Sequence, residues 1–361
     1  MTDAPSPEQQ RFLYARTATG VTPKRVRWLW RDRIPLGEIT LIVGRGGVGK
    51  STLLCTFAAW ITLGIMKGEF YGTPRDVIYV VNEDSLDYTV VPRLIAAGAD
   101  LSRVHFAHVR VAEGFDRVQF PKDCAAIRDM AKHYNAAVVM FDPLSSNISA
   151  KPNDQADMRG VLEKLRKVVE EADVAGMGLA HTRKAMSTNL MDAIMGSVEL
   201  GNVTRAVMGV MSDPDEEGTV LLSQEKNNLG RMDLPSYKYR IETFVMPVAG
   251  ADELEPPIET SNIKWLGKDD RTVSDMLSEG TQLIGKNALE EATEFVRAYL
   301  SHSSAGGEAL KADVMKAGQA EGFSRPTIER AATRLKVMSV PSGKGAQRLW
   351  RMPPAPPIPP G

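Results

Sequence analysis

The sequence has few cysteines, few aromatic residues and no long apolar run. Its 361 residues include two cysteines, Cys55 and Cys124, and neither has a partner at the spacing of a disulfide framework or a zinc motif. No run approaches the ~18 apolar residues that cross a bilayer, and the start of the chain has no apolar signal-peptide core. These absences predict a cytoplasmic protein in a reducing setting, with no membrane partner.

The chain also lacks a charge excess. Its formal net charge is −1, so any binding of nucleic acid has to rest on local clusters of positive charge. Hydrophobic residues make up 43% and charged residues 25%, which is typical of a folded globular protein. At this length the chain is expected to form two domains, or three.

Short β-branched runs alternate with helical stretches over much of the chain. This alternation predicts an α/β fold with a mainly parallel central sheet and crossover helices. The expected parallel strands are Ile39–Val43, Val77–Val81, Val138–Phe141 and Met177–Ala180, and the expected helices include Gly49–Thr62 and Gln155–Glu171. Three later runs, separated by turn signals, predict an added antiparallel section: Ala206–Met211, Thr219–Gln224 and Tyr237–Glu242.

Composition changes along the chain suggest where domains begin and end. The α/β pattern is followed by an acidic stretch with little periodicity, which contains Pro256-Pro257, and then by a compact helical pattern. The predicted division is a flexible segment over 1–22, an α/β domain over 23–247, an acidic linker over 248–286, a small helical domain over 287–352 and a disordered proline-rich tail over 353–361.

The strongest motif is a phosphate-binding loop. Gly44-Arg45-Gly46-Gly47-Val48-Gly49-Lys50-Ser51 fits the pattern G-x-x-x-x-G-K-[ST], and it follows an apolar strand and leads into the expected helix Gly49–Thr62, in which Thr52 is also expected to bind the nucleotide. Its backbone N–H groups and the helix N-terminus are suited to phosphate, Lys50 to the β- and γ-phosphates, and the Ser51 hydroxyl to Mg²⁺. The alternative is a glycine-rich turn, which the full motif in this context disfavours. ATP and Mg²⁺ are the predicted cofactors.

Carboxylates end two of the predicted strands. Asp142 follows Val138–Phe141 and is expected to hold Mg²⁺ together with Ser51, although an aspartate before a proline also forms turns. Glu83 and Asp84 follow Val77–Val81, at the sheet edge where ligands bind. Glu83 is the candidate general base for the attacking water. The alternative is that Glu83 and Asp84 cap the next helix.

His181 stands at the end of a further predicted strand and precedes Thr182-Arg183-Lys184. A polar side chain at this place can sense the γ-phosphate, whereas a lone histidine is more often structural.

These features, in this order, resemble the RecA-like hexameric ATPases, in particular the plasmid and phage replicative helicases of the RepA type within the DnaB-type group. Two later segments extend the resemblance over roughly residues 26–243: Gly196–Arg205, which matches the segment ending in the family's arginine finger, and Lys226–Gly230. The resemblance implies a RecA-like fold and a ring, a hexamer, in which Lys50, Ser51, Glu83, Asp142 and His181 act in cis.

By the same resemblance, Arg205 and Lys226 reach into the site of the neighbouring subunit, where an arginine stabilises charge on the transferred phosphoryl group. The alternatives are a surface salt bridge for Arg205 and a solvated strand end for Lys226. In such rings the loops after the Asp142 and His181 strands face the channel. Lys151, Arg183 and Lys184 are therefore candidates for contacts with single-stranded DNA, although loop cations are often merely solvated.

The last part of the chain concentrates positive charge. From Lys311 to Arg351 there are nine Lys and Arg residues and three Asp and Glu residues, a local charge of +6. Two predicted helices meet at a turn containing Gly322, and a hairpin-like end over Val337–Trp350 follows. The pattern resembles a winged-helix DNA-binding domain, with contacts from Arg325, Arg330 and Arg334. The alternative is a small domain for protein contacts.

The sequence thus predicts an ATP-hydrolysing DNA helicase or translocase acting in replication or recombination. Two rivals remain: a DNA-binding regulator switched by ATP, and a small-molecule kinase, for which there is no substrate-lid segment and no role for Arg205.

Overall fold

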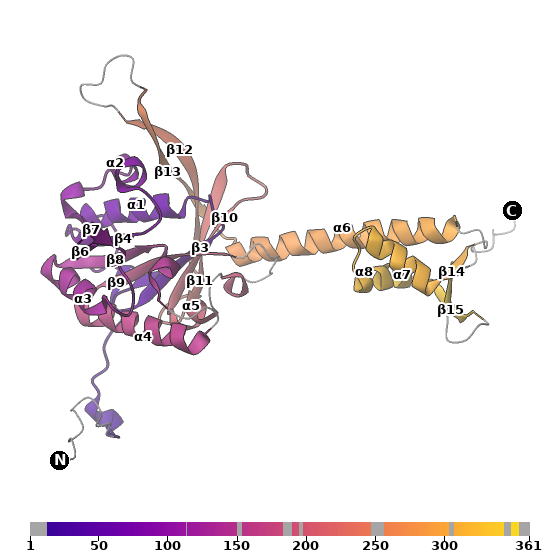
Figure 1. Cartoon of the computed structure of the whole chain (residues 1–361), viewed down its shortest axis with the longest axis horizontal. Helices are drawn as coiled ribbons and strands as arrows, with labels where there is room; N and C mark the ends of the chain where they lie inside the picture. Colours follow the sequence, from indigo (N-terminus) through magenta and orange to yellow (C-terminus); the bar gives the residue numbers. More distant parts are fainter. Residues whose placement is uncertain are drawn as a thin grey trace.

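The computed structural model describes most of the chain. The described residues are 13–112, 114–149, 154–182, 190–194, 198–246, 256–302, 307–342 and 348–353, with the backbone alone for 192, 198 and 280–287. Figure 1 shows an α/β body and a small helical module, joined by the long helix α6 (Val273–Ser301). At ~1.5 Å per residue, the 29 residues of α6 span roughly 43 Å.

A nine-stranded sheet forms the centre of the body, in the order β13-β12-β11-β10-β3-β9-β8-β4-β5. All neighbours from β10 to β5 run parallel, and those from β10 to β13 run antiparallel. The mainly parallel α/β sheet and the added antiparallel section predicted from the sequence are confirmed. In sheet order the strands are Ile258–Asp269, Ser236–Met246, Thr219–Asn227, Ala206–Ser212, Ile39–Gly44, Ala175–His181, Ala136–Asp142, Asp76–Val81 and Val104–Phe106.

The sheet is buried on both faces, which explains why its parallel strands read as continuous apolar runs. Because successive side chains point to opposite faces, Ile42 of β3 enters one core while Leu41 and Val43 enter the other. The first core is completed by α1 (Lys50–Thr62) and α2 (Val91–Ala96). The second is completed by α3 (Cys124–His133), α4 (Gln155–Ala172) and α5 (Val198–Val203).

The strand order brings the ends of four strands together. β9 lies between β3 and β8, and in the registers Gly44 pairs with His181 and Val81 with Asp142. The carboxyl ends of β3, β9, β8 and β4 therefore meet at one edge of the sheet, where ligands of parallel α/β folds bind.

The linker expected over residues 248–286 is corrected in its described part, which begins at residue 256. β13 forms an edge strand of the central sheet, and α6 begins at Val273 behind a capping box of Thr272 and Asp275. The sequence pattern misses both elements because Pro256-Pro257 and charged residues obscure the strand, and because glycines 280 and 285 weaken the helical signal by about 1 kcal/mol each.

The C-terminal module packs three helices against a three-stranded sheet of order β14-β16-β15. Its core contains Val296 of α6, Val314, Ile328 and Trp350. The last part of α6 packs in this module, and the hairpin-like end expected from the sequence is β15 with β16. The elements after α6 are β14 (Glu308–Leu310), α7 (Lys311–Ala320), α8 (Arg325–Arg334), β15 (Met338–Pro341) and β16 (Arg348–Arg351).

The remaining elements are short. Two small hairpins pair β1 (Trp28–Trp30) with β2 (Ile34–Pro35) and β6 (Val109–Val111) with β7 (Gly114–Asp116). The expected flexible start lies outside the described residues up to residue 12, and the expected proline-rich tail lies outside them from residue 354. Within the described part of the chain, no helix combines the length and the apolar character needed to cross a membrane.

Candidate active site

The phosphate-binding loop joins β3 to α1. Gly47 and Gly49 have φ values of +82° and +80°, a left-handed conformation that residues with a Cβ rarely adopt. No neighbouring atom lies within 4 Å of the place where a Cβ of Gly46 or Gly47 would stand. No side chain caps the N-terminus of α1, so its first N–H groups are available for an anion.

Lys50 lies at the centre of this loop and is only 5% exposed. Its Nζ donates hydrogen bonds to the carbonyl oxygens of Gly44 at 2.9 Å and Arg45 at 2.7 Å. Burial lowers the pKa of Lys50 to about 8, and the negative charge of Asp142 acts in the opposite direction. A buried ammonium without a carboxylate contact in the described structure is suited to a polyanionic ligand.

Asp142 ends β8 and is 7% exposed. The Tyr79 hydroxyl donates to its Oδ2 at 3.2 Å. Burial raises the pKa of Asp142, and a hydrogen bond with Ser51 acts in the opposite direction. A serine hydroxyl beside an aspartate carboxylate is a set of hard oxygen ligands, which Mg²⁺ prefers. The residues present therefore fit the predicted Mg²⁺ site.

Glu83 and Asp84 have separate partners. Ser146 Oγ donates to Glu83 Oε1 at 2.7 Å, and Arg93 Nη1 forms an ion pair with Asp84 Oδ2 at 2.9 Å. The π-helical turn that follows is capped by Ser85, whose side chain accepts from the backbone N–H of Tyr88. The structure therefore contradicts the alternative in which Glu83 and Asp84 cap the next helix, because Ser85 is the capping residue.

His181 ends β9 next to the phosphate-binding loop. Its Nδ1 lies 3.4 Å from Lys50 Nζ. Burial lowers the pKa of His181, and the positive charge of Lys50 lowers it further. A neutral imidazole with an unprotonated Nδ1 can accept a hydrogen bond from the ammonium, so His181 is coupled to the group that is expected to contact phosphate.

One cavity of about 390 Å³ brings these groups together. Eight residues assigned to the nucleotide site from the sequence line it, namely Gly47, Gly49, Lys50, Ser51, Thr52, Glu83, Asp142 and His181. The remaining lining residues are Asp84, Arg93, Leu179, Ile241 and Ser261. The arrangement can hold a triphosphate at the loop backbone and Lys50, with the carboxylates of Asp142 and Glu83 in the same cavity.

Several residues of this site are not identified by sequence reasoning. Ile241 of β12 and Ser261 of β13 reach the cavity because these strands cross over α1, and Ser261 Oγ lies 2.8 Å from Thr52 Oγ1. Their sequence neighbourhoods give no signal of this, since only the tertiary pairing brings them here. Tyr79 is different, because a tyrosine inside the buried run Val77–Val81 requires a hydrogen-bond partner and so indicates a polar group nearby.

Arg205 and Lys226 lie away from the cavity of their own chain. Ala206 pairs with Thr40 at the start of β3, whereas Gly44 pairs with Val210, so Arg205 is separated from the phosphate-binding loop by roughly 16 Å of strand. Arg205 is exposed and makes no ion pair with another described residue, so the surface salt bridge is not found. Lys226 Nζ donates to the carbonyl oxygens of Gly201 at 2.8 Å and Asn202 at 3.3 Å.

The candidate DNA contacts divide into two groups. Lys151, Arg183 and Lys184 lie outside the described residues. On α8, Arg325, Arg330 and Arg334 are all exposed, with Arg325 3.9 Å from Glu329 and Arg330 3.4 Å from the Thr327 hydroxyl.

The lowered pKa of Lys50 predicts how nucleotide binding depends on pH. Phosphate oxygens favour the ammonium form of Lys50. Above pH 8 the Lys50 side chain of the free protein has mostly lost its proton, so nucleotide binding there takes up a proton. Affinity for a fluorescent ATP analogue should therefore fall by up to about tenfold per pH unit above pH 8 and level off below it. A Lys50→Arg variant, whose charge persists, should show a flat profile, and an equal slope in both proteins would assign the titration to another group.

Comparisons with known proteins identify the family. A family described as "AAA domain" matches residues 5–187, which is just over half of the chain. No curated protein matches. The solved structures that resemble the chain include one described as an ATPase domain, which has 14% sequence identity and a TM-score of 0.42 over 55% of this chain and 80% of that one. The chain belongs to the AAA domain family.

Proposed function

We propose that the chain is an ATP-driven motor of the DNA helicase or translocase type, which acts in DNA replication or recombination and hydrolyses ATP at the subunit interfaces of a ring, a hexamer. One observation carries this proposal. Lys50, Ser51, Glu83, Asp142 and His181 line a single cavity, while Arg205 lies at the far end of the sheet. The cavity supplies the groups expected to bind the phosphates and Mg²⁺ and to activate the attacking water. The arginine that lines it, Arg93, is paired with Asp84 and is therefore not suited to stabilising charge in the transition state.

Each residue of the cavity has a proposed role. The loop backbone and Lys50 hold the β- and γ-phosphates, and Ser51 and Asp142 hold Mg²⁺. Mg²⁺, when bound, neutralises charge on the phosphates. Glu83, oriented by Ser146, accepts a proton from the attacking water. His181 responds to the γ-phosphate through its contact with Lys50.

Arg205 is proposed to act on the nucleotide of the neighbouring protomer. It is exposed, and it lies beside Lys226, because Ala206 pairs with Asn227 at the start of β10. Burial lowers the pKa of Lys226, and the nearby charge of Arg205 lowers it further. Two adjacent cations at the end of the sheet remote from the ATP cavity favour an anion brought by another chain, and a phosphate at a subunit interface is such an anion.

DNA is proposed to contact two regions. In the body we propose the segments that contain Lys151, Arg183 and Lys184, because the resemblance to RecA-like rings implies that such segments face a channel. In the C-terminal module the order helix, strand, helix, helix, strand, strand is that of a winged helix, and α8 presents Arg325, Arg330 and Arg334 to solvent. On this basis residues 287–352 form a DNA-binding domain whose arginines contact phosphates.

The first test is ATP hydrolysis by the full chain with and without single-stranded DNA. We expect the protein to form a ring with nucleotide and its hydrolysis rate to rise with single-stranded DNA, because the motor completes its cycle only when it grips the strand. A monodisperse ring that hydrolyses ATP at one rate whether or not DNA is present would refute the motor.

A second function is favoured by one feature, the local charge of +6 in the C-terminal module. If α8 binds duplex DNA and ATP serves as a switch, the chain is a regulator and does not unwind DNA. Strand displacement on a forked substrate separates the two, because a helicase releases the strand and a regulator does not.

A further inference from the structure

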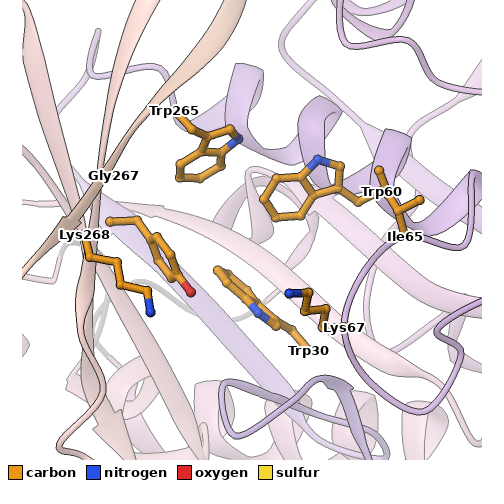
Figure 2. Close-up of a pocket in the computed structure, with 8 residues that line it drawn as sticks. Trp30, Trp60, Ile65, Lys67, Trp265, Gly267 and Lys268 are labelled. Carbon is orange, nitrogen blue, oxygen red and sulfur yellow. The ribbon is translucent and has the colours of Figure 1, made fainter.

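The body contains a second cavity, which the proposed function does not use. It has a volume of about 440 Å³ and lies at the C-terminal end of α1, ten residues along that helix from Lys50. We call it the aromatic cleft. Figure 2 shows its rings and its two lysines. The lining residues are Trp30, Trp60, Ile65, Lys67, Tyr237, Trp265, Gly267 and Lys268.

The aromatic rings form a connected set. The ring planes of Trp60 and Trp265 meet at 32°, and their centroids lie 5.3 Å apart. The ring planes of Trp30 and Tyr237 meet at 31°, and their centroids lie 5.6 Å apart. The indole Nε1 of Trp265 is buried and has no hydrogen-bond acceptor among the described residues. A buried donor without an acceptor is costly, so the cleft is suited to a ligand that combines a flat face with an acceptor.

A strand irregularity places a cation beside these rings. Trp265 and Lys268 are three positions apart in β13, a spacing that in a regular strand sends side chains to opposite faces. The register between β12 and β13 shifts at this point, because Tyr239 pairs with Trp265 whereas Lys238 pairs with Gly267, whose φ is +137°. The extra residue turns Lys268 to the face of Trp265, so both line the cleft.

Positive charge surrounds the cleft. Lys67 and Lys268 stand on either side of the rings (Figure 2), are exposed, and make no ion pair within the described structure. A neighbouring cavity of about 470 Å³ shares Trp30, Lys67, Tyr237 and Lys268 with the aromatic cleft and adds Arg31 and Arg33. Arg33 is buried, with its guanidinium 5.0 Å from the Trp30 ring and 4.9 Å from the Tyr237 ring, so the cations open to a ligand are Lys67, Lys268 and Arg31. Among the described residues that line the two cavities, Asp32 is the sole carboxylate.

We propose that the aromatic cleft binds single-stranded nucleic acid, with bases stacked on the partly exposed rings of Trp60 and Trp265 and phosphates held by Lys67 and Lys268. Stacking rings interleaved with cations match the alternation of bases and phosphates along a single strand. The two contiguous cavities together offer more space than one nucleotide fills, which favours a polynucleotide over a free nucleotide as the ligand. This site goes beyond the proposed function, since it requires neither a ring nor ATP hydrolysis.

The cleft is connected to the ATP cavity by three shared elements. α1 contributes Lys50 to one and Trp60 to the other, and β13 likewise contributes Ser261 and Trp265. On β12, Tyr239 contacts the Trp265 ring with centroids 5.6 Å apart and donates a hydrogen bond to the carbonyl of Val48 in the phosphate-binding loop at 3.2 Å. A nucleic-acid strand bound in the cleft therefore acts on Trp265, whose neighbour Tyr239 contacts the phosphate-binding loop.

The test is a titration of the full chain, without nucleotide, with a fluorescent dT oligonucleotide, followed by anisotropy and by quenching of tryptophan fluorescence. We expect the Lys67→Glu/Lys268→Glu variant to bind about 10- to 100-fold more weakly and to lose the quenching. The matched control is Lys264→Glu, an exposed lysine of the same strand that pairs with Glu242 instead of lining the cleft. Unchanged binding and quenching in the double variant would overturn the proposal.

Two further arms identify the ligand and guard against misfolding. Thymidine monophosphate and ATP, at equal nucleotide concentration, should quench much less than the oligonucleotide, and equal quenching would make the cleft a free-nucleotide site and overturn the proposal. Trp265→Phe, which keeps an aromatic ring and removes the unpartnered N–H, should weaken binding while thermal unfolding stays cooperative. The Arg325→Glu/Arg330→Glu variant should retain the quenching, so failure of the DNA contacts proposed for α8 is distinguishable from failure of the cleft.

Discussion

Replacing Arg205 with alanine should lower the rate of ATP hydrolysis by about 1,000-fold or more, while nucleotide binding stays near that of the unaltered chain. The physical reason is that Arg205 is remote from the cavity of its own chain, at the opposite end of β10 from Val210, which pairs with Gly44. It can therefore stabilise phosphoryl charge only in a neighbouring protomer. The measurements are steady-state hydrolysis and binding of a fluorescent ATP analogue.

Mixing makes this prediction specific. Arg205→Ala and Lys50→Ala proteins, each inactive alone, should regain activity when mixed, because an interface with Lys50 from one chain and Arg205 from the other is intact. At equal amounts and random assembly, about a quarter of the interfaces have this composition. Arg231→Ala is the matched control, since Arg231 is an exposed arginine paired with Asp233. Mixtures that stay inactive, although mixed rings demonstrably form, would exclude action in trans.

Replacing Glu83 with glutamine should reduce hydrolysis by about 100- to 10,000-fold, the range of a lost general base. The amide keeps the size of the side chain and can still accept the hydrogen bond from Ser146, but it does not take a proton from water. Single-turnover hydrolysis should show the loss, and nucleotide affinity should change little, because Glu83 is not among the groups expected to hold phosphate or Mg²⁺.

The control for this substitution is Asp87→Asn, an equivalent change on an exposed residue of the following turn that does not line the cavity. It should hydrolyse ATP at the normal rate. If Glu83→Gln hydrolyses ATP as fast as Asp87→Asn, water activation belongs to another group, and Asp84 is then the nearest carboxylate to test.

The sequence alone determined the parts of this protein that depend on local pattern. A buried parallel strand is a continuous apolar run, and the polar residue that follows the run marks its end. The sequence therefore predicts the phosphate-binding loop, the ends of β3, β4, β8 and β9, and the polar residues at those ends. Since parallel strands place these ends at one edge, the grouping of Lys50, Glu83, Asp142 and His181 followed from the fold class.

Tertiary structure alone decided the rest. The crossing of β12 and β13 over α1 brings Ile241 and Ser261 to the ATP cavity and Tyr237 and Trp265 to the aromatic cleft. These residues lie about 187 to 215 positions after Lys50 in the sequence, and long-range antiparallel pairing leaves no local periodic pattern that identifies the partner strand. The register shift that turns Lys268 toward Trp265 is likewise a property of the paired strands, because in sequence those two residues belong to opposite faces.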